Sequence, residues 1–152
     1  MTKIKIIIDY QVKSFKNLFE YCECIESITF KKFYRNNITD MSQMLYECSS
    51  LKKLNLNNFK TNNVTNMKSM FFGCSSLKEL NLNSFNTNNV TNIRGMFLWC
   101  SSLKELNINN FDTNNVYNMY YMFDGCLDEL IMKIKTKNKN IREEAIKKLV
   151  DD

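Results

Sequence analysis

The chain has 152 residues, 44% of them hydrophobic, and a formal net charge of +5 from 21 Lys or Arg and 16 Asp or Glu. It has no proline and only three glycines, so nothing marks a flexible linker, and we expect one domain spanning residues 1–152. Because the chain has no histidine, it lacks the usual general base and a common metal ligand.

Residues 1–11 are predicted to form an N-terminal cap strand. Lys3 and Lys5 alternate with isoleucines, and lysines on an edge strand discourage pairing with another molecule. Asp9 ends the apolar run too early for a secretory signal, which needs about 7–15 apolar residues. No stretch approaches the roughly 20 apolar residues of a membrane span. The chain as given is expected to be cytoplasmic, or to lie at the cell surface if it is cut from a longer precursor.

Residues 12–126 contain a 26-residue repeat, which the cysteines mark most clearly. Before each of these cysteines, apolar residues stand at i, i+3, i+4 and i+7, which predicts one face of a short helix. A polar residue precedes each predicted helix and can accept a hydrogen bond from its first turn. The cysteines are Cys22, Cys48, Cys74, Cys100 and Cys126, and the polar residues are Ser14, Asp40, Asn66, Asn92 and Asn118.

A short strand is predicted after each cysteine of the middle copies. Leu54 and Leu56 alternate with Asn55, and residues 80–82 and 106–108 repeat the pattern of a half-buried strand. A copy of this length cannot bury its own apolar face, so neighbouring copies must cover it in a solenoid. Parallel strands about 4.8 Å apart and helices about 8–10 Å apart would make the helical side splay.

Residues 127–152 depart from the repeat and are predicted to form a helical cap. Such a cap is needed because the last copy would otherwise expose its core-facing side to water. A first apolar group fits a last strand or a helix, and a second group forms a helical stripe. The first group is Leu130, Met132 and Ile134, and the second is Ile141, Ala145, Ile146 and Leu149.

The segment 85–108 carries the motifs Asn-Val-Thr, Met-Phe and Cys-Ser-Ser-Leu, and the copies 54–56 and 80–82 carry Leu-x-Leu. Over residues 12–126 the chain resembles the 26-residue repeat of bacterial and mycoplasma-type surface proteins, relatives of leucine-rich repeats often grouped with the BspA-like proteins. The resemblance implies adhesion or protein binding, commonly at a cell surface and without enzymatic activity. Trp99, which stands where other copies have Gly73 and Gly125, departs from the motif. The secretion signal expected of a surface member is also missing.

The predicted fold is therefore an α/β repeat, a right-handed solenoid similar to leucine-rich repeats. About five coils of 26 residues place a parallel sheet on one side and short helices on the other. The N-terminal strand and the C-terminal helical segment cap the two ends.

No enzyme, cofactor or metal site is expected. Five of the six cysteines recur on the inward face, and equivalent thiols in a ladder have no unique pairing, which favours reduced, buried cysteines. Cys22 and Cys24 have no second pair nearby, whereas structural zinc needs four ligands. Glu79 and Glu105 stand one copy apart and would suit an acid/base pair, but two charges on a solvated face explain them more simply.

The outward side of the strands is the leading candidate for a binding surface. Polar side chains recur there about every 5 Å and suit the backbone of a protein partner, although a ladder of asparagines that only satisfies itself is the alternative. Aromatic residues near the C-terminal copies are a second candidate. The strand-face residues are Lys53, Asn55, Asn57, Glu79, Asn81, Asn83, Glu105, Asn107 and Asn109, and the aromatic residues are Trp99, Tyr117, Tyr120 and Tyr121.

We therefore expect a non-enzymatic protein-interaction module with an unknown protein partner and no small-molecule substrate. A surface-exposed adhesin or structural repeat protein is the alternative. A weaker alternative is a binder of anions or nucleic acid that uses Lys52, Lys78, Lys104 and the basic cap. Nucleic acid is not expected, because the charge is modest and residues 131–152 hold seven Lys or Arg against four Asp or Glu.

Overall fold

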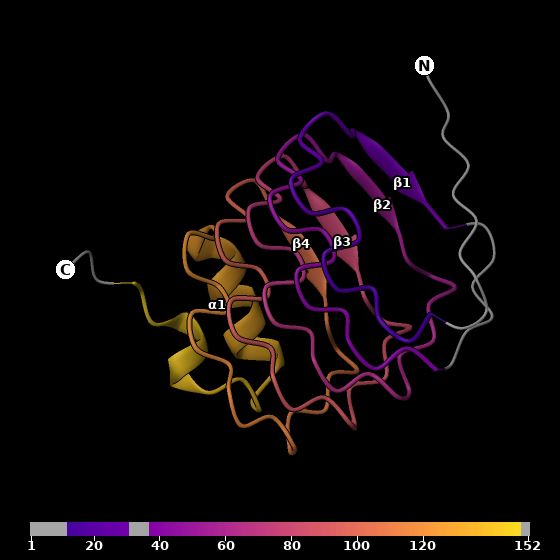
Figure 1. The fold of residues 1–152 in the computed structure, drawn as a ribbon. Helices are drawn as coiled ribbons and strands as arrows, with labels where there is room; N and C mark the ends of the chain where they lie inside the picture. The colour runs from indigo at the N-terminus through magenta and orange to yellow at the C-terminus, as the bar shows by residue number, and fades with distance from the viewer. Residues whose placement is uncertain (1–11, 31–36, 150–152) are drawn as a thin grey trace.

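The computed structural model describes residues 12–30 and 37–149, so the predicted cap strand 1–11 lies outside the described residues. Within them the chain is an α/β structure of short strands followed by one α-helix and one 3₁₀-helix (Figure 1). The elements are β1 (Ser27–Thr29), β2 (Lys53–Asn55), β3 (Glu79–Asn81), β4 (Glu105–Asn107), α1 (Asp128–Lys137) and η1 (Glu143–Ile146).

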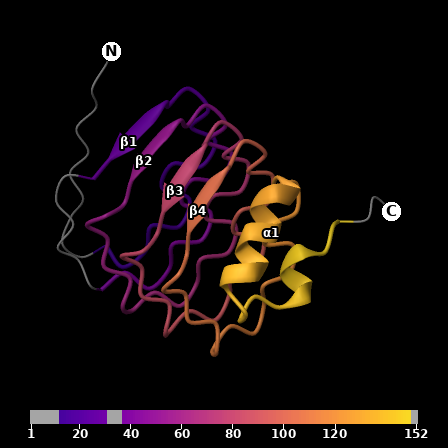
Figure 2. The same cartoon turned by 180° about the vertical axis from the view of Figure 1, so that it is seen from behind.

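Successive copies, numbered one to five by their cysteines, lie side by side in a 26-residue register. β1 pairs in parallel with β2, and β3 pairs in parallel with β4, with Leu80 opposite Leu106. Isolated parallel bridges join the copies again from Ser14 through to Asn118. The predicted parallel strands are confirmed, but they form two separate two-stranded sheets and not the single sheet expected. Figure 2 shows β1 to β4 in order along one side, with α1 beside β4.

The short helices predicted before each cysteine are wrong, because the described segments are runs of turns. In copy two, Gln43 and Glu47 have φ angles of 56° and 55°, in the left-handed region that an α-helix does not use. The amides of Met44 and Cys48 donate to carbonyls three residues back, as in β-turns. A left-handed residue at every fourth position returns the chain to the core, which produces the apolar spacing of a helix.

Hydrogen bonds between copies explain why these segments are not helical. In copy two, four alternate amides donate to carbonyls 25 residues ahead at 2.8–2.9 Å. An α-helix would use the same groups internally and would keep its neighbours 8–10 Å away. Backbone hydrogen bonds thus join all neighbouring copies on the turn side, and they join β1 to β2 and β3 to β4 on the strand side. The splay predicted for a helical side has no cause. The donors are Met41, Gln43, Leu45 and Glu47.

The polar residue before each turn run is a hydrogen-bond acceptor, as predicted, but it caps a turn and not a helix. Asp40 Oδ1 accepts the amide of Ser42 at 2.8 Å, and Asn92 Oδ1 accepts the amide of Arg94 at 3.0 Å. The other copies repeat this bond to the second residue onward, which defines an Asx turn or its serine equivalent. In every copy, the bond fixes the backbone two residues after the polar residue.

The core is a set of columns in which equivalent side chains stack. The rings of Phe71, Phe97 and Phe123 are fully buried and stack at centroid distances of 5.6 Å. Buried threonines join the copies through polar bonds. Thr87 Oγ1 donates to the carbonyl of Asp112 at 2.9 Å and accepts the Asp112 amide at 2.7 Å. Each copy therefore satisfies buried polar groups of its neighbour.

The cysteine column supplies hydrogen bonds as well as volume. All six cysteines are free thiols, and Cys100 Sγ donates to the carbonyl of Phe71 in the preceding copy at 3.1 Å. Cys48, Cys74 and Cys126 make the equivalent bond. Burial raises the pKa of Cys48 and of Cys126 to about 12, and it raises the pKa of Cys74 and Cys100 as well. The column thus stays protonated and can donate.

Alkylation should distinguish the buried thiols of the cysteine column from the exposed thiol of Cys24. At about pH 8 we expect iodoacetamide to modify Cys24 first and the half-buried Cys22 more slowly, because reaction needs an accessible thiolate. Cys74 and Cys100 should stay unmodified until the protein is unfolded in urea, when all six react. Peptide mass mapping over time measures the order. Early modification of Cys100 in the folded protein would contradict the packing described above.

α1 closes the C-terminal end of the stack where a further strand would follow β4. Leu130 and Ile134 are buried on α1, whereas Met132 is 63% exposed, so the first apolar group of the cap forms a helix and not a strand. The helical stripe predicted beyond it is shorter than expected. Only η1 forms there, with Ala145 buried and Leu149 41% exposed.

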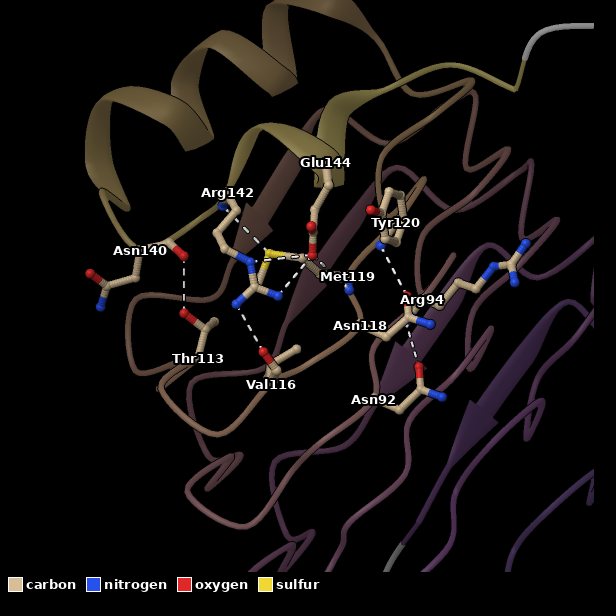
Figure 3. Close-up of polar contacts among 10 residues, drawn as sticks. All are labelled: Asn92, Arg94, Thr113, Val116, Asn118, Met119, Tyr120, Asn140, Arg142 and Glu144. Carbon is tan, nitrogen blue, oxygen red and sulfur yellow. Dashed lines mark hydrogen bonds and ion pairs between the residues drawn. The ribbon is translucent and has the colours of Figure 1, made fainter.

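Residues 140–145 supply the hydrogen-bonding partners that a sixth copy would provide (Figure 3). The amides of Tyr121 and Phe123 donate to the carbonyls of Glu144 and Ala145 at 3.1 and 3.0 Å. Arg142 Nη1 donates to the carbonyl of Val116 at 2.8 Å, and its Nη2 lies 2.8 Å from Glu144 Oε1. Backbone groups of copy five are thereby satisfied without another repeat.

Candidate docking groove

The strand face is the floor of an open groove of about 580 Å³, and α1 is one wall. β2, β3 and β4 supply the floor, while Lys133, Lys137 and Asn138 supply the wall. A helix is about 10–12 Å across, whereas strands are spaced at about 4.8 Å, so α1 stands above the sheet beside it. The cap therefore helps to shape the surface as well as to close the core.

Most of the predicted strand-face residues line this groove. Lys53 and Asn83 are exposed but do not line it. The sequence did not indicate the wall, although the spacing of Leu130 and Ile134 four residues apart is a signal for a helix. The predicted residues that line the groove are Asn55, Asn57, Glu79, Asn81, Glu105, Asn107 and Asn109.

The asparagines at the strand ends present hydrogen-bond donors. Asn55 Oδ1 and Asn81 Oδ1 each accept the amide two residues onward at 3.0 Å, and Asn107 Oδ1 does so at 3.2 Å. These side chains do not bond to one another across the described copies, so each amide oxygen serves its own turn. Within the described chain their Nδ2 groups have no partner. The result is a row of NH₂ donors, in which Asn81 and Asn107 lie directly opposite each other on the paired strands β3 and β4.

Charges of both signs lie next to the amide row. Lys133 Nζ is 2.9 Å from Glu129 Oε1 and 3.5 Å from Glu105 Oε1, so it links α1 to β4 across the edge of the groove. Hydrogen bonding to Glu129 and the charge of Glu105 raise the pKa of Lys133. Glu79, equivalent to Glu105 one copy earlier, makes no ion pair with another described residue. The floor therefore offers carboxylate acceptors beside amide donors.

The four aromatic residues predicted as a second surface do not form one cluster. The rings of Tyr120 and Tyr121 lie 5.9 Å apart, and the Arg94 guanidinium lies 5.6 Å from the Tyr121 ring. Trp99 packs on Phe72 instead, at 5.1 Å. Tyr117 is 70% exposed, and no ring contact in the described chain involves it.

Trp99 ends an aromatic row that is not among the predicted binding surfaces. Tyr21 contacts Tyr46 at 5.5 Å, Tyr46 stacks on Phe72 at 4.3 Å, and Phe72 contacts Trp99. Gly125, with a φ of 72°, makes room for the indole, because a Cβ there would overlap Trp99 Cδ1. The departure of Trp99 from the repeat motif is matched by glycine in the next copy.

Neither a metal centre nor a membrane helix is found in the part of the chain that the structure describes. No group of three His, Cys, Asp or Glu residues there could hold a metal ion. None of the helices among these residues is both long enough and apolar enough to cross a bilayer.

These observations define a repeat protein in which short parallel strands and turn runs pair copy with copy. The family model described as "Mycoplasma protein of unknown function, DUF285" matches residues 13–139, and the chain belongs to this family. The predicted relationship to mycoplasma-type repeats is thereby confirmed at the level of the family. Comparisons with curated proteins and with solved structures find no match.

Proposed function

We propose that the chain is a short solenoid similar to leucine-rich repeats and acts as a non-enzymatic protein-interaction module. The row of amide donors on the groove floor carries this proposal. Backbone carbonyls of an extended partner segment are suitable acceptors for such donors. The Asx turns hold Asn55, Asn81 and Asn107 in place before binding, which reduces the entropy lost on association.

The composition of the groove favours a hydrogen-bonded polypeptide. Its described lining contains amides, carboxylates, lysines and five aliphatic residues, but no aromatic ring; the aliphatic residues are Leu54, Leu80, Leu106, Leu130 and Ile134. Ring stacking, which binds nucleic-acid bases, is therefore not provided at this face. A polypeptide has both hydrogen-bond donors and acceptors on its backbone, and these can pair with the mixture of Glu79, Lys137 and asparagine side chains.

Substitution by aspartate tests the donors without removing the turns. The variant Asn55→Asp, Asn81→Asp, Asn107→Asp keeps each Oδ1 acceptor and removes the NH₂ donors. The control variant Asn62→Asp, Asn88→Asp, Asn114→Asp makes the same charge change at exposed positions of the same copies. A partner captured from the native host and purified should bind the groove variant at least about tenfold more weakly and the control almost normally, by calorimetry.

Equal affinity of both variants for that partner would reject the groove as the docking site. Unfolding midpoints of the two variants show whether either substitution has damaged the fold. The alternative of a surface adhesin rests on the resemblance to surface repeats and uses the same groove. Recovery of the intact protein only from washed cell surfaces would favour the adhesin, and recovery only from the cytosolic fraction would reject it.

A further inference from the structure

The turn side of the stack carries a row of cations that the groove does not use. Lys16, Lys68 and Arg94 occupy equivalent positions in copies one, three and four, and all three are exposed. Tyr120 holds this position in copy five, and Lys147 Nζ lies 5.9 Å from the centre of its ring. We name Lys16, Lys68, Arg94 and Lys147 the basic row.

The backbone fixes the alignment of this row. The amides of Lys16, Lys68 and Arg94 donate at 3.0–3.1 Å to the polar side chain two residues earlier. Backbone bonds hold neighbouring copies together beside it, such as that from the Ser69 amide to the Arg94 carbonyl at 2.9 Å. Figure 3 shows Arg94 next to Asn92 in copy four and Tyr120 next to Asn118 in copy five. The charged side chains thus stand on a rigid backbone in which neighbouring copies are about 4.8 Å apart.

No member of the basic row forms an ion pair with another described residue, and the same is true of the exposed Lys78 and Lys104. Lys52, Lys133, Lys135 and Arg142, in contrast, each lie within 3.5 Å of a glutamate. Lys52, which the sequence suggested as an anion contact, is 2.9 Å from Glu26. Exposed cations without partners create a positive potential that attracts anions.

Aromatic rings and acidic neighbours indicate the form of the anion. Tyr120 is 40% exposed beside Tyr121, and cations next to exposed rings bind single strands through phosphates and base stacking. Acidic residues stand four or five positions after the equivalent of Lys16 in copies one, two and five, namely Glu20, Glu47 and Asp124. A planar anionic membrane would meet these carboxylates as well, whereas a linear polyanion can follow the cations alone.

We propose that the basic row binds single-stranded nucleic acid, with phosphates along Lys16, Lys68 and Arg94 and a base against Tyr120. This inference does not depend on the groove, which lies on the strand side and contains no exposed ring. The sequence-based expectation named Lys52, Lys78 and Lys104, but Lys52 is paired with Glu26, and no contact between a cation and an aromatic ring in the described chain involves Lys78 or Lys104.

Fluorescence anisotropy with labelled RNA and DNA strands of about 15 nucleotides, at rising salt, tests the proposal. The variant Lys16→Gln, Lys68→Gln, Arg94→Gln should bind at least tenfold more weakly. The slope of log K against log salt should become shallower by about 2, since each phosphate contact to a single strand contributes about 0.7. The control Lys60→Gln, Lys78→Gln, Lys104→Gln removes equal charge at exposed positions outside the row and should change affinity less than about threefold.

Tyr120→Leu isolates the stacking contribution, because it leaves the charge unchanged and should weaken binding about tenfold. Circular dichroism checks that each variant is folded. Three results would overturn the proposal: no binding of the wild type at low salt, equal losses in the two triple variants, or binding of polyglutamate or phosphatidylserine vesicles in preference to both oligonucleotides. Preferential binding of RNA or of DNA supports it and identifies the natural strand.

Discussion

Replacement of Phe97 by alanine is expected to lower the free energy of unfolding by about 3–5 kcal/mol. The ring is fully buried between Phe71 and Phe123, with centroids 5.6 Å from each. Backbone bonds at 3.0 Å join Phe97 to Met122 and Phe71 to Met96, so the neighbouring copies cannot move together to fill the cavity. Urea unfolding followed by circular dichroism measures the loss.

Phe72→Ala is the matched control for this prediction. Phe72 is half-buried in the aromatic row on the outer surface, where it stacks on Tyr46 at 4.3 Å. Solvent can fill the space that its ring leaves, so the expected loss is only about 1–2 kcal/mol. Equal losses for Phe72→Ala and Phe97→Ala would mean that the inner phenylalanine column is not the core of the stack.

The repeat register and the inward residues could be predicted because burial between copies imposes them. Leu56, Leu82 and Ile108 recur at 26 residues and are all at most 1% exposed. Each of these side chains is covered by its equivalents in neighbouring copies, so an apolar period in sequence becomes an apolar column in space. The parallel pairing of β1 with β2 and of β3 with β4 follows from the same register.

The turn runs share the apolar spacing of a helix because both conformations return side chains to one face every three to four residues. The glycines were the signal that distinguished the two conformations. Gly73, Gly95 and Gly125 are the only glycines in the chain, and all have φ between 58° and 72°. In other copies the same positions hold residues such as Glu47 and Trp99 in the left-handed region, which hides the pattern.

The floor of the candidate groove was predictable, but its wall and the basic row were not. Strand alternation places Asn55, Asn81 and Asn107 outward whatever the neighbouring elements are. The position of α1 beside β4 depends on how the cap folds back, which a repeat period does not encode. Likewise, Arg94 contacts the Tyr121 ring of the next copy and Lys147 contacts the Tyr120 ring, and only the spatial arrangement reveals these contacts.

Arg142→Met is expected to cost about 1–3 kcal/mol of unfolding free energy, because it removes hydrogen bonds but keeps most of the side-chain volume. The guanidinium satisfies the Val116 carbonyl at 2.8 Å and holds Glu144, whose Oε1 also lies 3.4 Å from the Met119 amide. Lys139→Met is the control, since Lys139 is exposed and should tolerate the change with less than about 0.5 kcal/mol. Thermal unfolding of both variants measures the difference.

The location of the damage distinguishes a cap from an ordinary surface contact. In a stack where each copy touches only its neighbours, loss of the cap should release copy five before the copies nearer the N-terminus. Hydrogen exchange in Arg142→Met should therefore increase first at the Tyr121 and Phe123 amides, which bond to η1, and later at the Met41 and Leu45 amides. A uniform increase through all the described copies would show that Arg142 stabilises the stack as one cooperative unit and that residues 140–145 are not a separable cap.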